Sequence, residues 1–401
     1  MVLPPSYRGN FPLVTHPQKF RAACYTVEGV NSFATVIYFN YLYFFFHAQF
    51  GFSDKQNLAL AALIGGVYTI ASWQAGRFAQ RCGYFTALKL GFSVMAAGLA
   101  VGSQLRSVAG QIVTACIVNI GMCFIWPTLE ALVSEGAVAA RAVGIYNITW
   151  AAANALAYFI GGTLIEQFGY RVIFFLPFAA VLAQLALTFW IGKLHAGTSA
   201  GETEKVSLPP DPNRPTPAKA RAFQRMAWLS NPFAYIAINT LLAVMPGIAA
   251  KFHLSPMLAG FACSLWCFVR LAAFFALWHW TKWHYRFRWL VLAFALLILS
   301  FLGILVAPSL VAVVAAQIFF GVAVGLIYYS SLFYSMDASD TKGEHGGIHE
   351  AAIGLGNLVG PGVGAASLQF LPQYASSGAV AVSVLLLCGL GGLLTIWRMA
   401  K

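Results

Sequence analysis

The chain has 401 residues, of which 60% are hydrophobic and only 9% are charged, and its mean hydropathy is +0.74. Soluble domains of this length do not have such a composition, so the sequence predicts an integral membrane protein. The net charge of +12 does not indicate a nucleic-acid-binding protein, because the basic residues are spread over many loops without an accompanying aromatic pattern.

About twelve apolar runs of roughly 20 to 28 residues follow one another along the chain, each long enough to cross a bilayer core of about 30 Å. The predicted spans are 21–48, 57–79, 84–104, 108–133, 140–165, 171–193, 223–250, 256–281, 288–306, 309–335, 346–371 and 376–397. The expected fold class is therefore an all-α, multi-pass membrane protein.

The Lys and Arg residues fall almost entirely on alternate sides of these spans. With the amino terminus inside, the loops on the opposite side receive only Lys55, Arg106, Arg171 and Lys251. Positive charge stays cytoplasmic during insertion, so we expect both termini in the cytoplasm and an even number of spans. A bacterial inner membrane is the expected location.

One long polar stretch, His195 to Arg221, is rich in Gly, Ser and Pro and cannot bury a core. We therefore expect residues 1–194 to form an N-terminal six-helix half, residues 195–222 a flexible cytoplasmic linker, and residues 223–401 a C-terminal six-helix half. Two six-span units joined in this way have the layout of parallel repeats related by an axis along the membrane normal.

The fifth span of each half carries a similar sequence. Residues 144–162 read GIYNITWAAANALAYFIGG, and residues 347–365 read GIHEAAIGLGNLVGPGVGA. The aligned pairs include Gly144 with Gly347, Asn147 with Glu350, Asn154 with Asn357 and Gly161 with Gly364. Together with the position of the linker, this similarity indicates an internal repeat.

The loop between spans 2 and 3, residues 76–85, reads GRFAQRCGYF. It resembles the signature loop of the major facilitator superfamily, Gly-x-x-x-Asp-Arg-x-Gly-Arg-Arg: Gly76, Arg81 and Gly83 match, and Gln80 replaces the acidic residue. The resemblance implies two pseudo-symmetric six-helix bundles that act as a secondary transporter. In that family the loop locks the cytoplasmic gate by ion pairing, so Gln80 implies a weaker, neutral hydrogen bond.

Charged side chains inside a span cost about 2.5–3.5 kcal/mol on insertion scales, so each one needs a reason. Glu28 begins a polar stripe with Asn31 and Tyr38 on span 1, which favours a water-filled cavity over a helix–helix seam. Arg270, in the middle of span 8, requires a carboxylate partner or an anionic ligand, and Glu350 on span 11 is the candidate partner. A purely structural Arg270–Glu350 pair is the alternative.

Other polar and aromatic residues recur at helical spacing, which is typical of a cavity for a solute that is partly apolar and partly hydrogen-bonding. These further candidates are Trp126, Asn147, Trp150, Asn154, Tyr235, Asn239 and Tyr328. Any single stripe of this kind is more often packing than binding. For Glu130, one turn after Trp126, a position at the membrane interface is slightly favoured.

The function that these features favour is secondary transport of a small organic solute, with an anionic solute as one option. Proton coupling is expected through Glu350, with Glu28 as a second carboxyl group and His349 as a neighbouring titratable group. The Gly-Pro pattern of residues 356–364 resembles that of proton antiporters of the superfamily, but those carry it in span 5. Proton-antiport efflux of amphipathic compounds therefore stays open, as does a non-transporting receptor on the same fold.

The sequence carries no nucleotide-binding loop and no His-Glu-x-x-His motif, so we expect no enzyme and no cofactor. His345 and His349 could share a metal on a helix, but the glycines between them make a helix start the favoured interpretation and a metal is not expected. The expected partners are a small solute, a coupling proton and the lipid bilayer, and the protein is expected to be a monomer.

Overall fold

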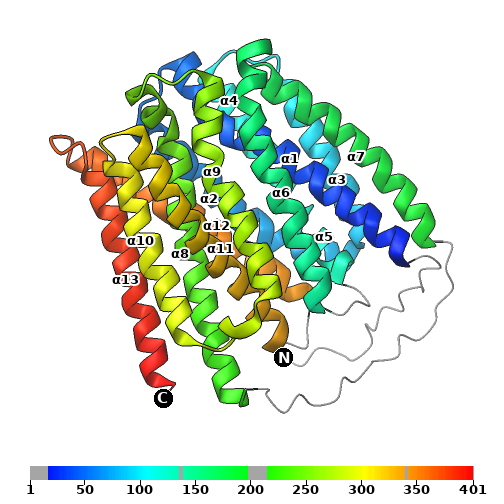
Figure 1. Cartoon of the computed structure of the whole chain (residues 1–401). Helices are drawn as coiled ribbons and strands as arrows, with labels where there is room; N and C mark the ends of the chain where they lie inside the picture. Colours follow the sequence, from blue (N-terminus) through cyan, green and yellow to red (C-terminus); the bar gives the residue numbers. More distant parts are fainter. Residues whose placement is uncertain (1–16, 135–138, 197–214, 339–341, 401) are drawn as a thin grey trace.

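The computed structural model describes residues 17–134, 139–196, 215–338 and 342–400, and these form α-helices with one short 3-10 turn, η1 (Thr281–Trp283) (Figure 1). The N half contains α1 (Pro17–Phe50), α2 (Asp54–Cys82), α3 (Tyr84–Gly102), α4 (Val108–Cys123), α5 (Trp126–Ser134), α6 (Ala139–Phe168) and α7 (Val172–Ala196). The C half contains α8 (Pro217–Lys251), α9 (Pro256–His279), α10 (Phe287–Val306), α11 (Leu310–Ala338), α12 (Lys342–Phe370) and α13 (Ser377–Met399). Most of the predicted linker lies outside the described residues, and α8 begins within its predicted range.

Each predicted span coincides with a helix over most of its length, except that span 4 is divided into α4 and α5. Pro127 explains the division, because proline lacks the N–H group that would continue the helical hydrogen-bond ladder. The break is closed by two tight turns, in which Phe124 N–H donates to the Gly121 carbonyl at 3.2 Å and Ile125 N–H donates to the Met122 carbonyl at 2.9 Å.

The helices have the length and composition of membrane spans. Eleven stretches of the described chain qualify, with α4 and α5 counted as one span. The 34-residue α1 is not among them, because its tyrosines and asparagines dilute its apolar residues. Large apolar side chains cover the flanks of the bundle, as at Ile70, Leu299 and Val311, which are 67%, 69% and 78% exposed. Such surfaces suit contact with lipid, so the chain is an integral, multi-pass membrane protein.

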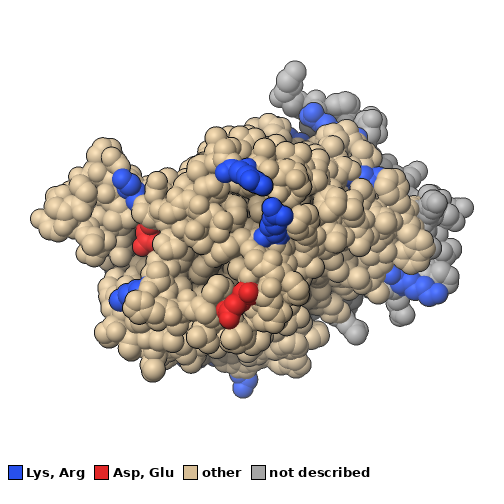
Figure 2. Space-filling view, turned by 90° about the horizontal axis from the view of Figure 1, so that it is seen from above, with Lys and Arg blue, Asp and Glu red and all other residues tan. Residues whose placement is uncertain are grey.

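The starts of α1 and α8 and the ends of α7 and α13 lie toward the same end of the bundle, which we name the linker end (Figure 1). The opposite end, here named the far end, carries the short connections such as α1–α2 and α8–α9. Figure 2 views the far end from above and shows a mostly uncharged surface with a few separate basic and acidic side chains. The sparse basic charge there agrees with the pattern seen in the sequence.

Two pairs of helices join the halves. The fifth span of the N half, α6, packs on α9, the second span of the C half, and α12 packs on α2 in the same relation. We name these contacts the α6/α9 seam and the α2/α12 seam. A Cβ atom at Gly162 would meet the main chain of Pro256, and one at Gly65 would meet the main chain of Asn357. The helices in both seams therefore approach as closely as small residues allow.

Polar contacts tie both seams together at the far end. The Glu166 carboxylate accepts a hydrogen bond from the Met257 backbone N–H at 3.0 Å, and Lys55 Nζ donates to Gln369 Oε1 at 2.9 Å. Each contact joins one half to the other, so both seams are held closed at this end.

Candidate functional site

A cavity of about 170 Å³ lies between the two halves. Its wall is built by α1, α2, α4, α5 and α6 of the N half and by α8, α9, α11 and α12 of the C half. A cavity shared by both halves is the place where a repeat-built transporter fold holds its solute.

Nine of the residues that the sequence proposed line this cavity: Glu28, Trp126, Trp150, Asn154, Tyr235, Asn239, Arg270, Tyr328 and Glu350. Four proposed residues are not among its lining residues: Asn31, Tyr38, Asn147 and His349.

Local contacts explain where two of these four side chains lie. The ring of Tyr38 is buried within the N half, edge-to-face against Phe39 and Phe174 at centroid distances of 4.9 and 5.7 Å. The Asn147 side chain accepts a hydrogen bond from Trp150 Nε1 at 3.1 Å. Asn147 therefore orients an indole ring of the cavity wall without lining the wall itself.

Other polar residues that were not predicted as site residues also line the cavity, among them Tyr68, Asn119, Tyr146 and Asn357. The sequence signal that could have identified them is a polar residue inside an apolar span.

The prediction for Glu130 was wrong. The structure places Glu130 in the cavity wall, whereas a position at the membrane interface was slightly favoured. Glu130 lies on α5, after the break that the predicted continuous span did not include.

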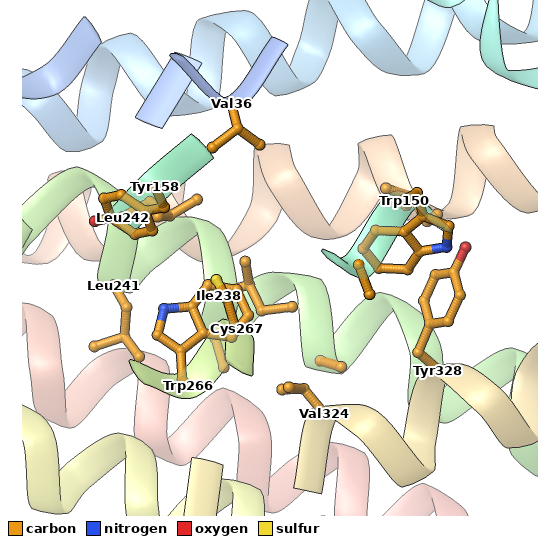
Figure 3. Close-up of a cluster of buried hydrophobic side chains, with 14 of the residues drawn as sticks. Val36, Trp150, Tyr158, Ile238, Leu241, Leu242, Trp266, Cys267, Val324 and Tyr328 are labelled. Atoms are coloured by element: carbon orange, nitrogen blue, oxygen red, sulfur yellow. The ribbon is translucent and has the colours of Figure 1, made fainter. Parts of the chain in front are cut away.

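Arg270 is the only Lys or Arg among the described residues that line the cavity, and it is only 4% exposed. Its Cζ atom lies 4.5 Å from the ring centroid of Trp150 and 4.8 Å from that of Trp266. Figure 3 shows Trp150 beside Tyr328, and Trp266 beside Cys267. Two indole rings, one from each half, thus stabilise the buried guanidinium by cation–π contact.

The guanidinium of Arg270 makes no ion pair with any carboxylate of the described chain, and its Nε and Nη2 atoms are buried without a hydrogen-bond partner. The alternative of a structural Arg270–Glu350 pair is therefore wrong for this structure. A buried guanidinium with two open donors is suited to an anionic group that enters the cavity.

Carboxyl groups gather in another part of the cavity wall. The Tyr68 hydroxyl donates a hydrogen bond to Glu350 across the α2/α12 seam. The Ser32 hydroxyl donates to Glu28 Oε1 at 2.9 Å. Glu28, Glu130 and Glu350 lie within electrostatic range of one another, and we name them the carboxyl cluster. Burying several like charges together is costly unless protons or a cation neutralise them.

Amides complete the polar wall. The Asn239 side chain donates a hydrogen bond to that of Asn357, which joins α8 to α12. Asn119 Nδ2 donates to the Ile64 carbonyl at 2.9 Å, which joins α4 to α2. These bonds hold the amides in place on neighbouring helices within each half.

The predicted gate loop joins α2 to α3. Gly83 has φ +92°, a conformation that favours glycine, and it lets α3 begin directly after α2. Gly76 is buried, while Gln80 and Arg81 are exposed. Neither of these two side chains makes a hydrogen bond or ion pair with another described residue.

Comparisons with known proteins show similarity in structure alone, since no family model and no curated protein matches the sequence. The chain is similar to the human organic anion transporter MFSD10 (TETRAN), with a TM-score of 0.68, 14% identity, and 94% of this chain and 99% of that chain covered. A peptide transporter POT in complex with sulfate gives a TM-score of 0.73, 15% identity and 95% coverage of each chain. A POT family transporter in complex with 5-aminolevulinic acid gives 0.74, 11% identity, and coverage of 96% and 97%. The chain therefore has the major facilitator fold of two pseudo-symmetric six-helix bundles.

Proposed function

We propose that the protein is a secondary transporter that moves a small organic solute by alternating access, with the cavity between the halves as the solute site. The observation that carries the proposal is Arg270, a buried cation with open donors in a cavity walled by both halves. A solute held by both halves is released to either side when the halves rock about it. The structural neighbours, an organic anion transporter and peptide transporters, support a small-molecule solute.

The carboxyl cluster supports proton coupling as part of this proposal. Glu350 faces the cavity and accepts a hydrogen bond from Tyr68 of the other half, so rearrangement of the α2/α12 seam changes the surroundings of its carboxyl group. A group whose surroundings alternate in this way can load a proton in one conformation and release it in the other. Glu28 is the second carboxyl group proposed for this role.

The proposed topology places both termini and the 195–222 linker in the cytoplasm of a bacterial cell, with the protein as a monomer in the inner membrane. The uneven distribution of Lys and Arg supports this orientation. A single cysteine at Ser207 on a cysteine-free background should resist an impermeant thiol reagent in intact cells. One at Ser376, in the far-end connection between α12 and α13, should react. Strong labelling at Ser207 would contradict the orientation.

Transport is tested by a thermal-shift screen on the purified protein followed by uptake into proteoliposomes. A solute at about 100 times its dissociation constant stabilises the native state by roughly 2.7 kcal/mol, which a screen detects. We expect a stabilising solute to be taken up against its gradient when a pH gradient is imposed. Solutes that bind but never cross the membrane, in counterflow or under any ion gradient, would contradict transport and favour a receptor.

A further inference from the structure

We propose that the solute is a zwitterion whose carboxylate binds Arg270 and whose ammonium group binds at the carboxyl cluster. The inference rests on the proposed solute site and specifies the chemical class that this site selects. It follows from three features of the cavity: an open cationic edge, a group of acidic side chains apart from it, and an aromatic wall.

The cationic end is defined by geometry. Nε and Nη2 of Arg270 lie along one edge of the planar guanidinium, and neither has a hydrogen-bond partner. The rings of Trp150 and Trp266 lie against the guanidinium, with their centroids within 5 Å of Cζ, at 4.5 and 4.8 Å. A ligand therefore forms its best hydrogen bonds when it approaches the open Nε/Nη2 edge in the plane of the guanidinium. The two oxygens of a carboxylate match that edge with two parallel, charge-assisted hydrogen bonds.

The acidic end selects the opposite charge. Glu28 is 1% exposed and Glu350 is 4% exposed, and each accepts a hydrogen bond only from a hydroxyl or other neutral side chain in the described chain. An ammonium group carries three donors and no acceptor, so it complements carboxylates that keep further lone pairs. A second carboxylate or a phosphate on the solute would instead be repelled here.

The wall between the two ends is aromatic. The ring of Tyr328 lies 5.0 Å from that of Trp150 and 6.3 Å from that of Tyr235, measured between centroids. Such rings present apolar faces to a short methylene stem and a few polar edges to its ends. The structure thus favours one carboxylate and one ammonium group joined by a short aliphatic chain over a compound with either charge alone.

A matched series of five-carbon probes tests this inference by calorimetry on the purified full-length protein. The probes are δ-aminovalerate, which carries both charges, valerate, which carries the carboxylate alone, and pentylamine, which carries the ammonium group alone. β-Alanine, γ-aminobutyrate and ε-aminocaproate vary the distance between the charges. At least one of the zwitterions should bind about tenfold or more tightly than both singly charged probes. Equal or tighter binding of valerate or of pentylamine, or no binding by any zwitterion, overturns the inference.

Variants assign the two ends. Arg270→Gln should reduce the affinity for the best zwitterion to that of pentylamine, and Glu350→Gln or Glu28→Gln should reduce it to that of valerate. Arg288→Gln is the matched control, because Arg288 also lies over an indole ring, that of Trp289 at 5.4 Å, but is exposed on α10. If Arg270→Gln fails to fold, Arg270→Lys replaces it and should weaken zwitterion binding while leaving pentylamine binding unchanged. If the Arg270 variant keeps the preference for the zwitterion, the assignment of the carboxylate end is overturned. If both Glu variants keep it, the assignment of the ammonium end is overturned.

The binding measurement also separates this inference from the proposed transport. A zwitterion that binds tightly but is never carried into proteoliposomes contradicts transport and leaves the assigned solute class intact. Uptake of valerate without uptake of any zwitterion would contradict the assigned solute class and leave the proposed transport intact.

Discussion

The two seams that join the halves are built alike but carry opposite charge. In the α6/α9 seam, the Arg270 guanidinium of the C half lies over the Trp150 ring of the N half. In the α2/α12 seam, the Glu350 carboxyl of the C half accepts a hydrogen bond from the Tyr68 hydroxyl of the N half. The internal repeat pairs Glu350 with Asn147, so a neutral amide in one seam corresponds to a carboxyl group in the other.

The difference shows how a repeated architecture acquires an asymmetric site. The repeat supplies the shape, because in both seams a fifth helix packs closely on a second helix through glycine. Single side chains then supply the chemistry, one seam with a buried guanidinium and the other with a carboxyl group. In the proposed transport cycle both seams rearrange when the halves rock, so a solute in contact with both would bias that motion.

The largest expected effect comes from removing the acid of the α2/α12 seam. Glu350→Gln should abolish accumulation driven by a pH gradient while exchange at a saturating solute concentration continues, because an amide keeps the shape of the side chain but cannot take up a proton. Flux into proteoliposomes, measured with and without a pH gradient, checks this. Tyr68→Phe is the matched control, since it deletes the hydrogen bond to Glu350 but keeps the carboxyl group. Continued accumulation by the Gln variant under a proton gradient alone would show that coupling does not depend on Glu350.

Close packing is the feature that the two seams share, and bulk at their glycines should impair both. Gly162→Val and Gly65→Val each place carbon atoms against the main chain of the opposite half, so the two halves should no longer pack closely. We expect solute flux to fall about tenfold or more in each variant. Gly391→Val on α13 is the control, because nothing lies within 4 Å of a Cβ atom at that position. Loss of flux in only one of the two seam variants would mean that transport requires close packing in one seam and not in the other.

Exchange of the cation in the α6/α9 seam should have a smaller effect. Arg270→Lys keeps the charge but loses the planar fork of donors, so we expect the affinity for a carboxylate-bearing solute to fall about tenfold, or roughly 1.4 kcal/mol. Calorimetry on the purified variant measures this. The exposed Arg288→Lys should leave the affinity unchanged. Equal affinity of the Arg270→Lys variant would indicate that the guanidinium does not contact the solute.

The helices were largely predictable from the sequence, because apolar runs of membrane-spanning length leave little choice of local structure. The exception, the break between α4 and α5, arises where Pro127 follows Trp126 within an otherwise continuous apolar run. Proline was visible there, but prolines also occur inside α7, α8 and α12 without dividing them. Whether a proline bends or ends a helix therefore depended on packing.

The cavity was only partly predictable, because spacing along a helix does not fix which way the helix is turned. Trp150 and Asn154 face the cavity, whereas Asn147 of the same stripe bonds to the Trp150 indole. The sequence also offered Glu350 as a structural partner for Arg270, since both charges are buried in the C half. Two indole rings surround Arg270 instead, and an aromatic partner cannot be distinguished from ordinary apolar packing by its position in the sequence.

The smallest expected effect concerns those rings. Trp266→Phe keeps an aromatic face near Arg270 but weakens the cation–π contact, so the affinity for carboxylate-bearing probes should fall about threefold. The Arg77–Trp73 pair offers a matched control on α2, because Arg77 Cζ lies 4.0 Å from the Trp73 ring while that ring is 45% exposed. Trp73→Phe should leave solute affinity unchanged, since this pair lies outside the cavity.

Trp266 also packs edge-to-face on Phe320 at 5.6 Å, so its replacement can lower thermal stability through packing alone. Binding of the three probes distinguishes loss of packing from loss of the cation–π contact. If Trp266 acts by holding the guanidinium in place, the loss of affinity should appear with valerate and δ-aminovalerate and be absent with pentylamine, which lacks the carboxylate. An equal loss for all three probes would mean that the ring shapes the cavity without positioning the charge. Arg270 alone would then account for the anion preference that we propose for the α6/α9 seam.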